Sequence, residues 1–425
     1  MASAALLGCP SASPQDPVDG TTQAGAPSST PGSTTAPGGS GDASATGSGE
    51  SADTVGDGAA APAHPACADD ESQIIAIPKS EAALLQAGLV KMVTVLAPNG
   101  GAIRLTAQGG VSDAQLLRAR RVFEFYLSDA AGSQFGQDKS AVANALADNG
   151  ATLVYFNTEA DSESAQRGAL QQVEGAFQDL YATESPVEGS AAYLQSTVRD
   201  ATYEELFHLV QGGGIVESLP AYQQQLEDAT QSALDAGVWT PPADVLAEWE
   251  AEGSLSFEYI ISVIDVYYGL WEHAPAPSFY GEYQLAARED LARMDAAGLA
   301  AVQAFLPEAV GHWVELDPSF TGTFSLALDD AQPYTLKSQH LRHVGLSGTA
   351  DAGLLGNAAD NTLRGNEGAN GLDGGAGEDT VVYCAPRGDF EVERDGETVI
   401  VDGPAGRDVL RDVEHVHFLD RIIDL

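Results

Sequence analysis

The sequence predicts an α+β domain between a low-complexity N-terminal segment and an all-β C-terminal region. Residues 10–70 consist mostly of Ser, Thr, Gly, Ala, Pro and Asp. Segments with strand-like and helix-like hydrophobic patterns alternate in the first part of the region 71–315. Near the C-terminus, glycines recur at every ninth position, and such a period is typical of stacked β-structure repeats.

The charge of the chain limits its partners. The 425 residues carry a formal net charge of −43, whereas a nucleic-acid-binding protein needs a basic surface. We therefore expect no nucleic-acid partner. Such acidity suits a protein outside the cell, where calcium and salt bind or screen carboxylates. We also expect no membrane-spanning helix, because the sequence has no apolar run of the roughly 20 residues that cross a bilayer.

Residues 1–9 end in Leu6-Leu7-Gly8-Cys9, which resembles a bacterial lipobox. The resemblance implies that Cys9 is lipidated after signal cleavage and anchors the chain to a membrane surface. The preceding residues are few for a signal peptide, so 1–9 would be a signal-peptide remnant, and an accidental match stays open. Residues 10–70 bury too little apolar surface to offset the entropy of ordering. We expect a disordered tether or linker there.

Cys67 and Cys384 lie at opposite ends of the part that is expected to fold. They could form a disulfide in an oxidising compartment, or both could remain free thiols. The sequence leaves the two alternatives open.

The region 71–315 begins with strands and helices in alternation. Strands are predicted at 74–77, 91–97, 102–106 and 152–156, with turn residues such as Asn149-Gly150 between them. Ser112 begins a helix that runs to about Leu127 with apolar residues at helical spacing. Further helices are predicted at 139–147, 166–181, 221–236 and after Ser254. The pattern predicts a small sheet packed against helices.

One helix in this region carries a candidate metal site. Glu204 and His208 are four residues apart, so they share one helix face and could bind one ion together. Glu205 lies one step round, and the glycines 212–214 are expected to end the helix. The segment resembles the zincin helix His-Glu-x-x-His, with Glu204 in place of the first histidine.

A later helix adds a third candidate ligand. Glu258 follows His208 by 50 residues and opens an apolar helix, which resembles the third-ligand helix of the gluzincin branch of the zincins. The resemblance implies a zincin-like domain at 71–315, with Glu204, His208 and Glu258 as metal ligands and Glu205 as the general base. In the alternative, Glu204 and His208 form only a helical side-chain pair. A di-iron bundle is disfavoured because it needs a second Glu-x-x-His motif on a facing helix.

The ligand set affects the choice of metal. Two carboxylates and one imidazole make a harder and more anionic site than two imidazoles and one carboxylate. Zn²⁺ remains an option, and Mn²⁺ or Fe²⁺ competes better. The extra negative ligand also makes the ion a weaker Lewis acid.

The repeat at 347–385 keeps three positions in phase, and one of them is apolar, at Leu363, Leu372 and Val381. Gly356, Gly365 and Gly374 are followed five residues later by Asn361, Asn370 and Asp379, and the last unit matches Gly-Gly-x-Gly-x-Asp-x-apolar-x through Gly375 and Gly377. This resembles the hemolysin-type (RTX) calcium-binding repeat at the C-terminal end of serralysin-like secreted proteases. The resemblance implies a calcium β-roll in which these eight residues bind Ca²⁺, with Asn361 and Asp379 on stacked turns.

The segments around the repeat are also β-like. A β connector is predicted at 316–346, with strands at 320–328, 334–341 and 344–346, and an antiparallel β cap at 386–425. The predicted fold is therefore a disordered tether, an α+β zincin-like domain and an all-β calcium β-roll with a cap.

The predicted function follows from these parts. We expect a secreted or surface-tethered bacterial calcium-binding protein with a divergent metal-dependent hydrolase domain that acts on a peptide or protein substrate. The alternative is a non-catalytic extracellular adhesion or matrix protein that calcium stabilises. The sequence does not identify the substrate, and it does not show whether catalysis survives Glu204 in place of histidine.

Overall fold

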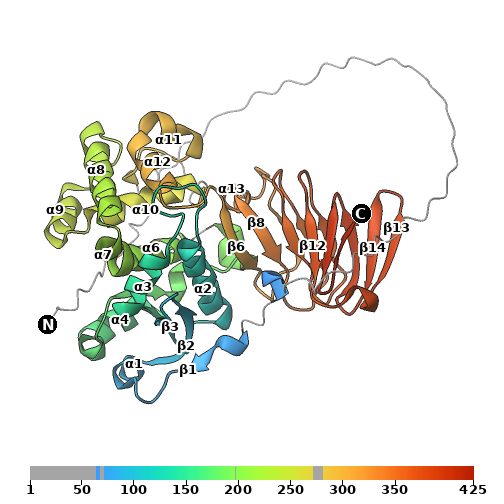
Figure 1. Ribbon diagram of the computed structural model, residues 1–425, viewed down its shortest axis with the longest axis horizontal. Helices are drawn as coiled ribbons and strands as arrows, with labels where there is room; N and C mark the ends of the chain where they lie inside the picture. The colour runs from blue at the N-terminus through green and yellow to red at the C-terminus, as the bar shows by residue number, and fades with distance from the viewer. Residues whose placement is uncertain (1–63, 68–70, 197, 271–280) are drawn as a thin grey trace, which may run out of the picture. The chain divides into compact units, whose positions relative to one another are not determined.

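A computed structural model describes residues 64–67, 71–196, 198–270 and 281–425 (Figure 1). The predicted lipobox with Cys9 and nearly all of the predicted linker 10–70 lie outside the described residues. None of the helices within the described ranges has the length and apolar character needed to cross a membrane.

The first part of the chain is α+β and contains a mixed five-stranded sheet. The strands follow the order β1 (Ile75–Ala76), β2 (Leu89–Leu96), β3 (Ala102–Gln108), β4 (Thr152–Phe156) and β5 (Phe177–Tyr181). The first three strands pair antiparallel, and β3, β4 and β5 pair parallel. The predicted strands in this region are confirmed, with small shifts of their ends.

Helices surround this sheet and continue after it (Figure 1). They are α1 (Ala82–Gln86), α2 (Asp113–Leu127), α3 (Ser140–Asp148), α4 (Glu159–Gln166), α5 (Ala191–Gln195), α6 (Thr202–Val210), α7 (Val216–Ser218), α8 (Pro220–Ala236), α9 (Ala243–Glu252), α10 (Leu255–Tyr267), α11 (Arg288–Met294) and α12 (Ala296–Gln303). The predicted start of α2 is confirmed, because the Ser112 hydroxyl accepts a hydrogen bond from the Gln115 amide, and the Gln115 side chain accepts one from the Ser112 amide.

The helix predicted at 166–181 is wrong. The chain leaves α4 after Gln166 and enters β5 at Phe177, where it pairs in parallel with β4. Gly175 forms the turn into β5 with a φ of +113°, and a Cβ there would lie 2.7 Å from the Asn149 carbonyl oxygen. The buried edge of β4 therefore selects a strand where the local pattern suggested a helix.

The expected helix end at the glycines 212–214 is also wrong. The chain continues from α6 through a π-helical segment, Gln211–Ile215, into α7. A Cβ at Gly214 would lie 2.7 Å from Val142 Cγ1, and one at Gly213 would lie 2.9 Å from Leu146 Cδ2. These glycines permit the close approach of the π-helical segment to α3, so their role is packing rather than termination.

The C-terminal region is β-rich and forms two six-stranded sheets (Figure 1). One sheet has the order β17 (Ile422–Asp424), β16 (His415–Phe418), β12 (Thr380–Tyr383), β10 (Thr362–Arg364), β8 (Leu341–Gly345) and β6 (Val310–Glu315). The other has the order β13 (Glu391–Asp395), β14 (Thr398–Gly403), β15 (Gly406–Arg411), β11 (Gly371–Asp373), β9 (Ala352–Leu355) and β7 (Gly322–Ser325). Consecutive strands from β6 to β12 alternate between the sheets.

The repeat positions set the register of these sheets. Leu363 of β10 pairs with Val381 of β12, and Leu372 of β11 pairs with Leu354 of β9, all in parallel. The four side chains are buried. At the C-terminal end the pairing becomes antiparallel, between β13, β14 and β15 and between β16 and β17. The spacing of nine residues thus places Leu363, Leu372 and Val381 at equivalent buried positions of β10, β11 and β12.

The strand predicted at 334–341 is wrong in its first part. Residues Thr335–Ser338 form a helical turn, α13, and β8 begins only at Leu341. This turn closes the end of β7: the Tyr334 hydroxyl accepts a hydrogen bond from the Ser325 amide, and the Ser338 hydroxyl donates one to the Ser325 carbonyl. These two hydrogen bonds to the backbone of Ser325 stabilise the helical turn at 335–338.

Cys67 and Cys384 form a disulfide with a Cα–Cα distance of 5.3 Å. The free-thiol alternative is thereby excluded. Arg364 of β10 also donates a hydrogen bond to the carbonyl of Ala66, next to the disulfide. These contacts attach the segment 64–67 to the C-terminal sheets.

His312 of β6 is buried against α2 and α6. Its Nδ1 lies 3.3 Å from the Trp313 carbonyl oxygen and its Nε2 lies 2.7 Å from the Tyr203 hydroxyl. Burial lowers the pKa of His312 to about 4, against an opposing effect of Glu188, so the ring is neutral near pH 7. Because the Trp313 carbonyl can only accept, Nδ1 carries the single ring hydrogen, and Nε2 accepts from the Tyr203 hydroxyl.

Substitution of Gly214 by alanine should destabilise the fold, because the new methyl group meets Val142 and Leu146. We expect a loss of about 1–3 kcal/mol in the free energy of unfolding, measured by urea denaturation. The matched control is Gly311→Ala, where nothing lies within 4 Å of the added Cβ. Equal stability of the two variants would contradict the packing role.

Acidification should weaken the fold through His312. The unfolded chain binds the imidazole proton below a pKa of 6.5, but the folded chain binds it only below about 4, so stability falls as the pH drops between these values. From pH 7 to pH 5, we expect wild type to lose about 2 kcal/mol more than His312→Gln in urea unfolding. Equal losses in both proteins would refute this assignment.

Candidate metal centre

Helices α6 and α10 bring three buried ligand-type side chains together. Glu204 and His208 are one turn apart on α6, and Glu258 stands in the first turn of α10. Their ligand atoms all lie within 4.8 Å of one another, and the three residues are 8%, 1% and 3% exposed. This group could hold a metal ion.

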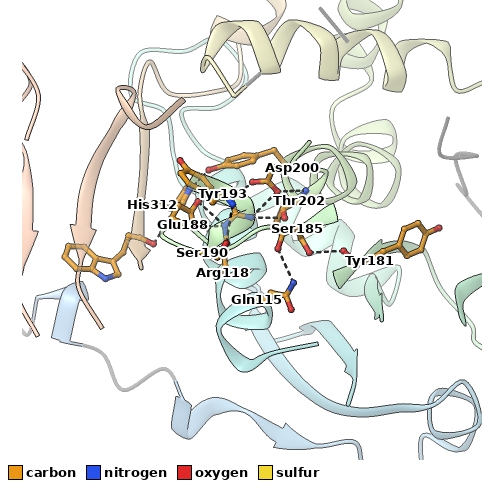
Figure 2. Close-up of polar contacts among 12 residues, drawn as sticks. Gln115, Arg118, Tyr181, Ser185, Glu188, Ser190, Tyr193, Asp200, Thr202 and His312 are labelled. Carbon is orange, nitrogen blue, oxygen red and sulfur yellow. Dashed lines mark hydrogen bonds and ion pairs between the residues drawn. The ribbon is translucent and has the colours of Figure 1, made fainter. Parts of the chain in front are cut away.

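A buried ionic network fixes the start of α6 (Figure 2). Arg118 of α2 donates to both carboxylate oxygens of Glu188 at 2.8 and 3.0 Å, and to the Thr202 hydroxyl at 2.8 Å. It also binds Asp200, whose carboxylate accepts from the Thr202 amide at 3.1 Å. Removal of one partner from such a buried network typically costs about 3–5 kcal/mol. The network therefore positions the first turn of α6 and, with it, Glu204.

A second arginine contacts the candidate ligands directly. Arg199 precedes α6 and donates one guanidinium N–H to Glu204 Oε2. Another N–H of the same group reaches Asp265 on α10 at 3.2 Å. Asp265 lies about two turns beyond Glu258 on the same helix. Arg199 thus connects the two helices that supply the three candidate ligands.

Glu205 lies against His208 and the neighbouring sheet. Its Oε2 is 3.5 Å from His208 Nδ1 and accepts a hydrogen bond from Gln178 of β5 at 2.6 Å. A carboxylate on one ring nitrogen fixes the orientation of a metal-binding histidine. His208 Nε2 is then the nitrogen that would bind an ion.

The site contains a large excess of acidic groups. Burial raises the pKa of Glu184 to about 9, and the charges of Glu205 and Glu204 add to the effect. Burial and the charge of Glu204 also help raise the pKa values of Asp265 and Glu282 to about 7. Each of these carboxyl groups is harder to ionise because the others are close and water is scarce.

The pKa values of Glu205 and His208, both on α6, are raised for different reasons. Burial raises the pKa of Glu205 to about 7, although its contact with His208 opposes this. Burial alone would lower the pKa of His208, but the charges of Glu258, Glu205 and Glu204 outweigh it and raise the pKa to about 9. In the described part of the chain, the acidic side chains at this site outnumber the cationic groups that contact them, Arg199 and His208.

The donor set fits a divalent cation. Two carboxylates and one imidazole are ligands that Zn²⁺, Mn²⁺ and Fe²⁺ all accept. A bound cation would also compensate the buried negative charge that raises the carboxyl pKa values. The predicted ligands are therefore brought together, and the predicted base Glu205 lies beside His208.

The predicted calcium residues lie in the turns of the C-terminal sheets. The backbone amide of Asn361 donates a hydrogen bond to Asp379 Oδ1 at 2.7 Å, which places these two residues on stacked turns. The Asn370 amide makes the same contact with Asp408, at 2.9 Å. Gly375 and Gly377 have φ values of +91° and +137°, a conformation that only glycine adopts at low cost.

Close packing of the turns also requires the repeat glycines. A Cβ at Gly356 would lie 1.9 Å from the Gly374 carbonyl oxygen, and one at Gly374 would lie 2.1 Å from the Asp412 carbonyl oxygen. A Cβ at Gly365 would meet Asn370 Oδ1 at 2.4 Å. These glycines therefore lie directly against carbonyl oxygens of neighbouring turns or, at Gly365, against a side-chain oxygen of the same turn.

Sequence reasoning missed several residues of the metal centre and, in the C-terminal turns, Asp408. Asp265 could have been found, because its spacing from Glu258 places both on one face of α10. Arg199, Glu184 and Glu282 lie outside the two motif helices and carry no local signal. Asp408 was missed because it does not follow the period of nine.

No protein-family model matches this chain, and no curated protein has significant sequence similarity to it. Its function must therefore be argued from the geometry of the site.

Proposed function

We propose that this protein is an extracytoplasmic metal-dependent hydrolase with a peptide or protein substrate. The observation that carries the proposal is the buried group Glu204, His208 and Glu258, in which two helices supply one imidazole and two carboxylates within 4.8 Å. A surface pair of Glu204 and His208 would not need Glu258, and it would not be enclosed by further acidic side chains.

The residues around the group have separate roles. A divalent ion held by Glu204, His208 and Glu258 would supply Lewis acidity for hydrolysis. Glu205 orients His208 through Nδ1, the ring nitrogen that faces away from the ion. Its proposed role as general base, which the helix motif implies, requires the carboxylate to turn from Nδ1 to within hydrogen-bond reach of the attacking water. Zn²⁺ is the first metal to test, followed by Mn²⁺ and Fe²⁺.

The C-terminal sheets are proposed to be a calcium β-roll. The alternation of β6 to β12 between two parallel sheets and the glycine-rich turns support this reading. In the described turns, no three acidic, histidine or cysteine side chains meet in metal-binding geometry. Calcium would therefore depend on backbone carbonyls together with Asp379, Asn361 and Asn370.

The disulfide between Cys67 and Cys384 supports a location outside the reducing cytosol, because disulfides persist in oxidising compartments. The strongly acidic composition agrees with a calcium-containing medium. We therefore propose that the protein is secreted or held at the cell surface.

The metal centre can be tested by metal analysis of purified protein. After dialysis against Zn²⁺ or Mn²⁺ with excess calcium, wild type should retain about one transition-metal ion per chain, and His208→Ala should lose it. Glu205→Gln should retain the ion but lose at least about 100-fold in the rate of peptide hydrolysis. The His415→Ala variant, on β16, should retain both metal and activity.

Two outcomes would contradict this proposal. Wild type without a transition metal would refute the metal centre. A retained ion with no hydrolysis of any peptide library, in wild type as in Glu205→Gln, would favour the alternative of a non-catalytic extracellular binding protein.

Calcium should stabilise the C-terminal sheets. Addition of millimolar Ca²⁺ should raise the midpoint of thermal unfolding, followed by circular dichroism, by at least about 5 °C. Asp379→Asn should reduce this shift by half or more, whereas Asp395→Asn in the exposed β13–β14 hairpin should leave it unchanged. An unfolding midpoint that does not respond to Ca²⁺ would rule out the calcium β-roll.

A further inference from the structure

The metal centre contains a cation that its sequence motif does not include. Two imidazoles and one carboxylate, a common ligand set for catalytic zinc, carry one negative charge. Glu204, His208 and Glu258 carry two when both carboxylates are ionised. The guanidinium of Arg199 binds Glu204 Oε2. With its positive charge, the ligands and Arg199 together carry one negative charge.

The positive charge of Arg199 interacts strongly with its carboxylate partners because all of them are buried. The side chains of Arg199, Glu204 and Asp265 are 9%, 10% and 5% exposed, so water screens their interactions poorly. Arginine remains protonated in such a site, and its planar group can bind two carboxylates at once. Arg199 uses this geometry to contact Glu204 on α6 and Asp265 on α10.

We propose that Arg199 is a positioning residue that offsets the charge of Glu204 and thereby sets the metal affinity of the site. It binds Oε2 of Glu204, which leaves the other carboxylate oxygen available to an ion. It also limits the negative charge on the ion, which preserves Lewis acidity that a second anionic ligand would reduce. This inference rests on the proposed metal centre.

A purely structural role for Arg199 predicts something different. If the residue only joined α6 to α10, its loss would destabilise the protein and loosen the ligands, so metal affinity would fall. If it offsets charge, its loss removes a cation close to the bound metal, and metal affinity should rise. The direction of the change therefore separates the two roles.

The experiment is a titration of the metal-free full-length protein with Zn²⁺ and, separately, Mn²⁺ by isothermal calorimetry in saturating calcium. Arg199→Met should bind Zn²⁺ at least about tenfold more tightly than wild type. Arg199→Lys retains the charge and should stay within about threefold of wild type. Arg288→Met removes an arginine that stacks on Tyr267 at the other end of α10, with 4.0 Å between guanidinium and ring centre, and should not change the affinity.

A folding defect in Arg199→Met would not prevent the test. The double variant Arg199→Met/Asp265→Asn also removes the second carboxylate that Arg199 binds, so no charge at Asp265 is left without its partner. Compared with Asp265→Asn alone, which is its reference protein, the double variant should bind Zn²⁺ at least about tenfold more tightly.

The outcomes distinguish the two proposals. If wild type binds neither ion, the proposed metal centre itself is refuted. If wild type binds, but Arg199→Met binds no more tightly than wild type and the double variant no more tightly than Asp265→Asn, the metal centre stands, and the charge-offset role of Arg199 is refuted.

Discussion

The burial of several carboxylates between α6 and α10 is the constraint on which the centre of this protein depends. Glu204 and Glu258 are almost fully buried, and Glu205, Asp265 and Glu184 lie around them. An ionised carboxylate in such surroundings is costly unless a cation or a proton compensates it. The raised pKa values of Glu205, Asp265 and Glu184 express that cost, and a bound divalent ion would relieve it.

Two arginines organise the approach to this cluster. Arg118 fixes Asp200 and Thr202 at the start of α6, and Arg199, the residue before Asp200, reaches forward to Glu204 and Asp265. The short segment that carries both contacts is thus held by α2 on one side and by α10 on the other. This segment positions Glu204. Arg118, Asp200 and Arg199 therefore serve the site although they lie outside the helix motif.

The C-terminal sheets also depend on polar and acidic groups, but these groups lie in the turns between short strands. Their strands are short, and each contributes few buried apolar side chains, such as Leu363 of β10 and Val381 of β12. Their turns join carboxylates to backbone amides of stacked turns, as in the hydrogen bond from the Asn361 backbone amide to Asp379. The antiparallel pairs β13–β14 and β16–β17 lie at the ends of these sheets and protect the last parallel strands.

The sequence by itself determined the features that arise from local periodicity. The spacing of Glu204 and His208 placed both on one helix face, and the period of nine placed Leu363, Leu372 and Val381 in the core. Only the tertiary structure decided which distant groups meet. It brought Glu258 and Arg199 to the helix motif, joined Cys67 to Cys384, made 177–181 a strand through its pairing with β4, and carried the helix through the glycines at 213 and 214. The physical reason is that burial, pairing and charge compensation depend on neighbours far apart in the chain, and a local pattern carries no information about them.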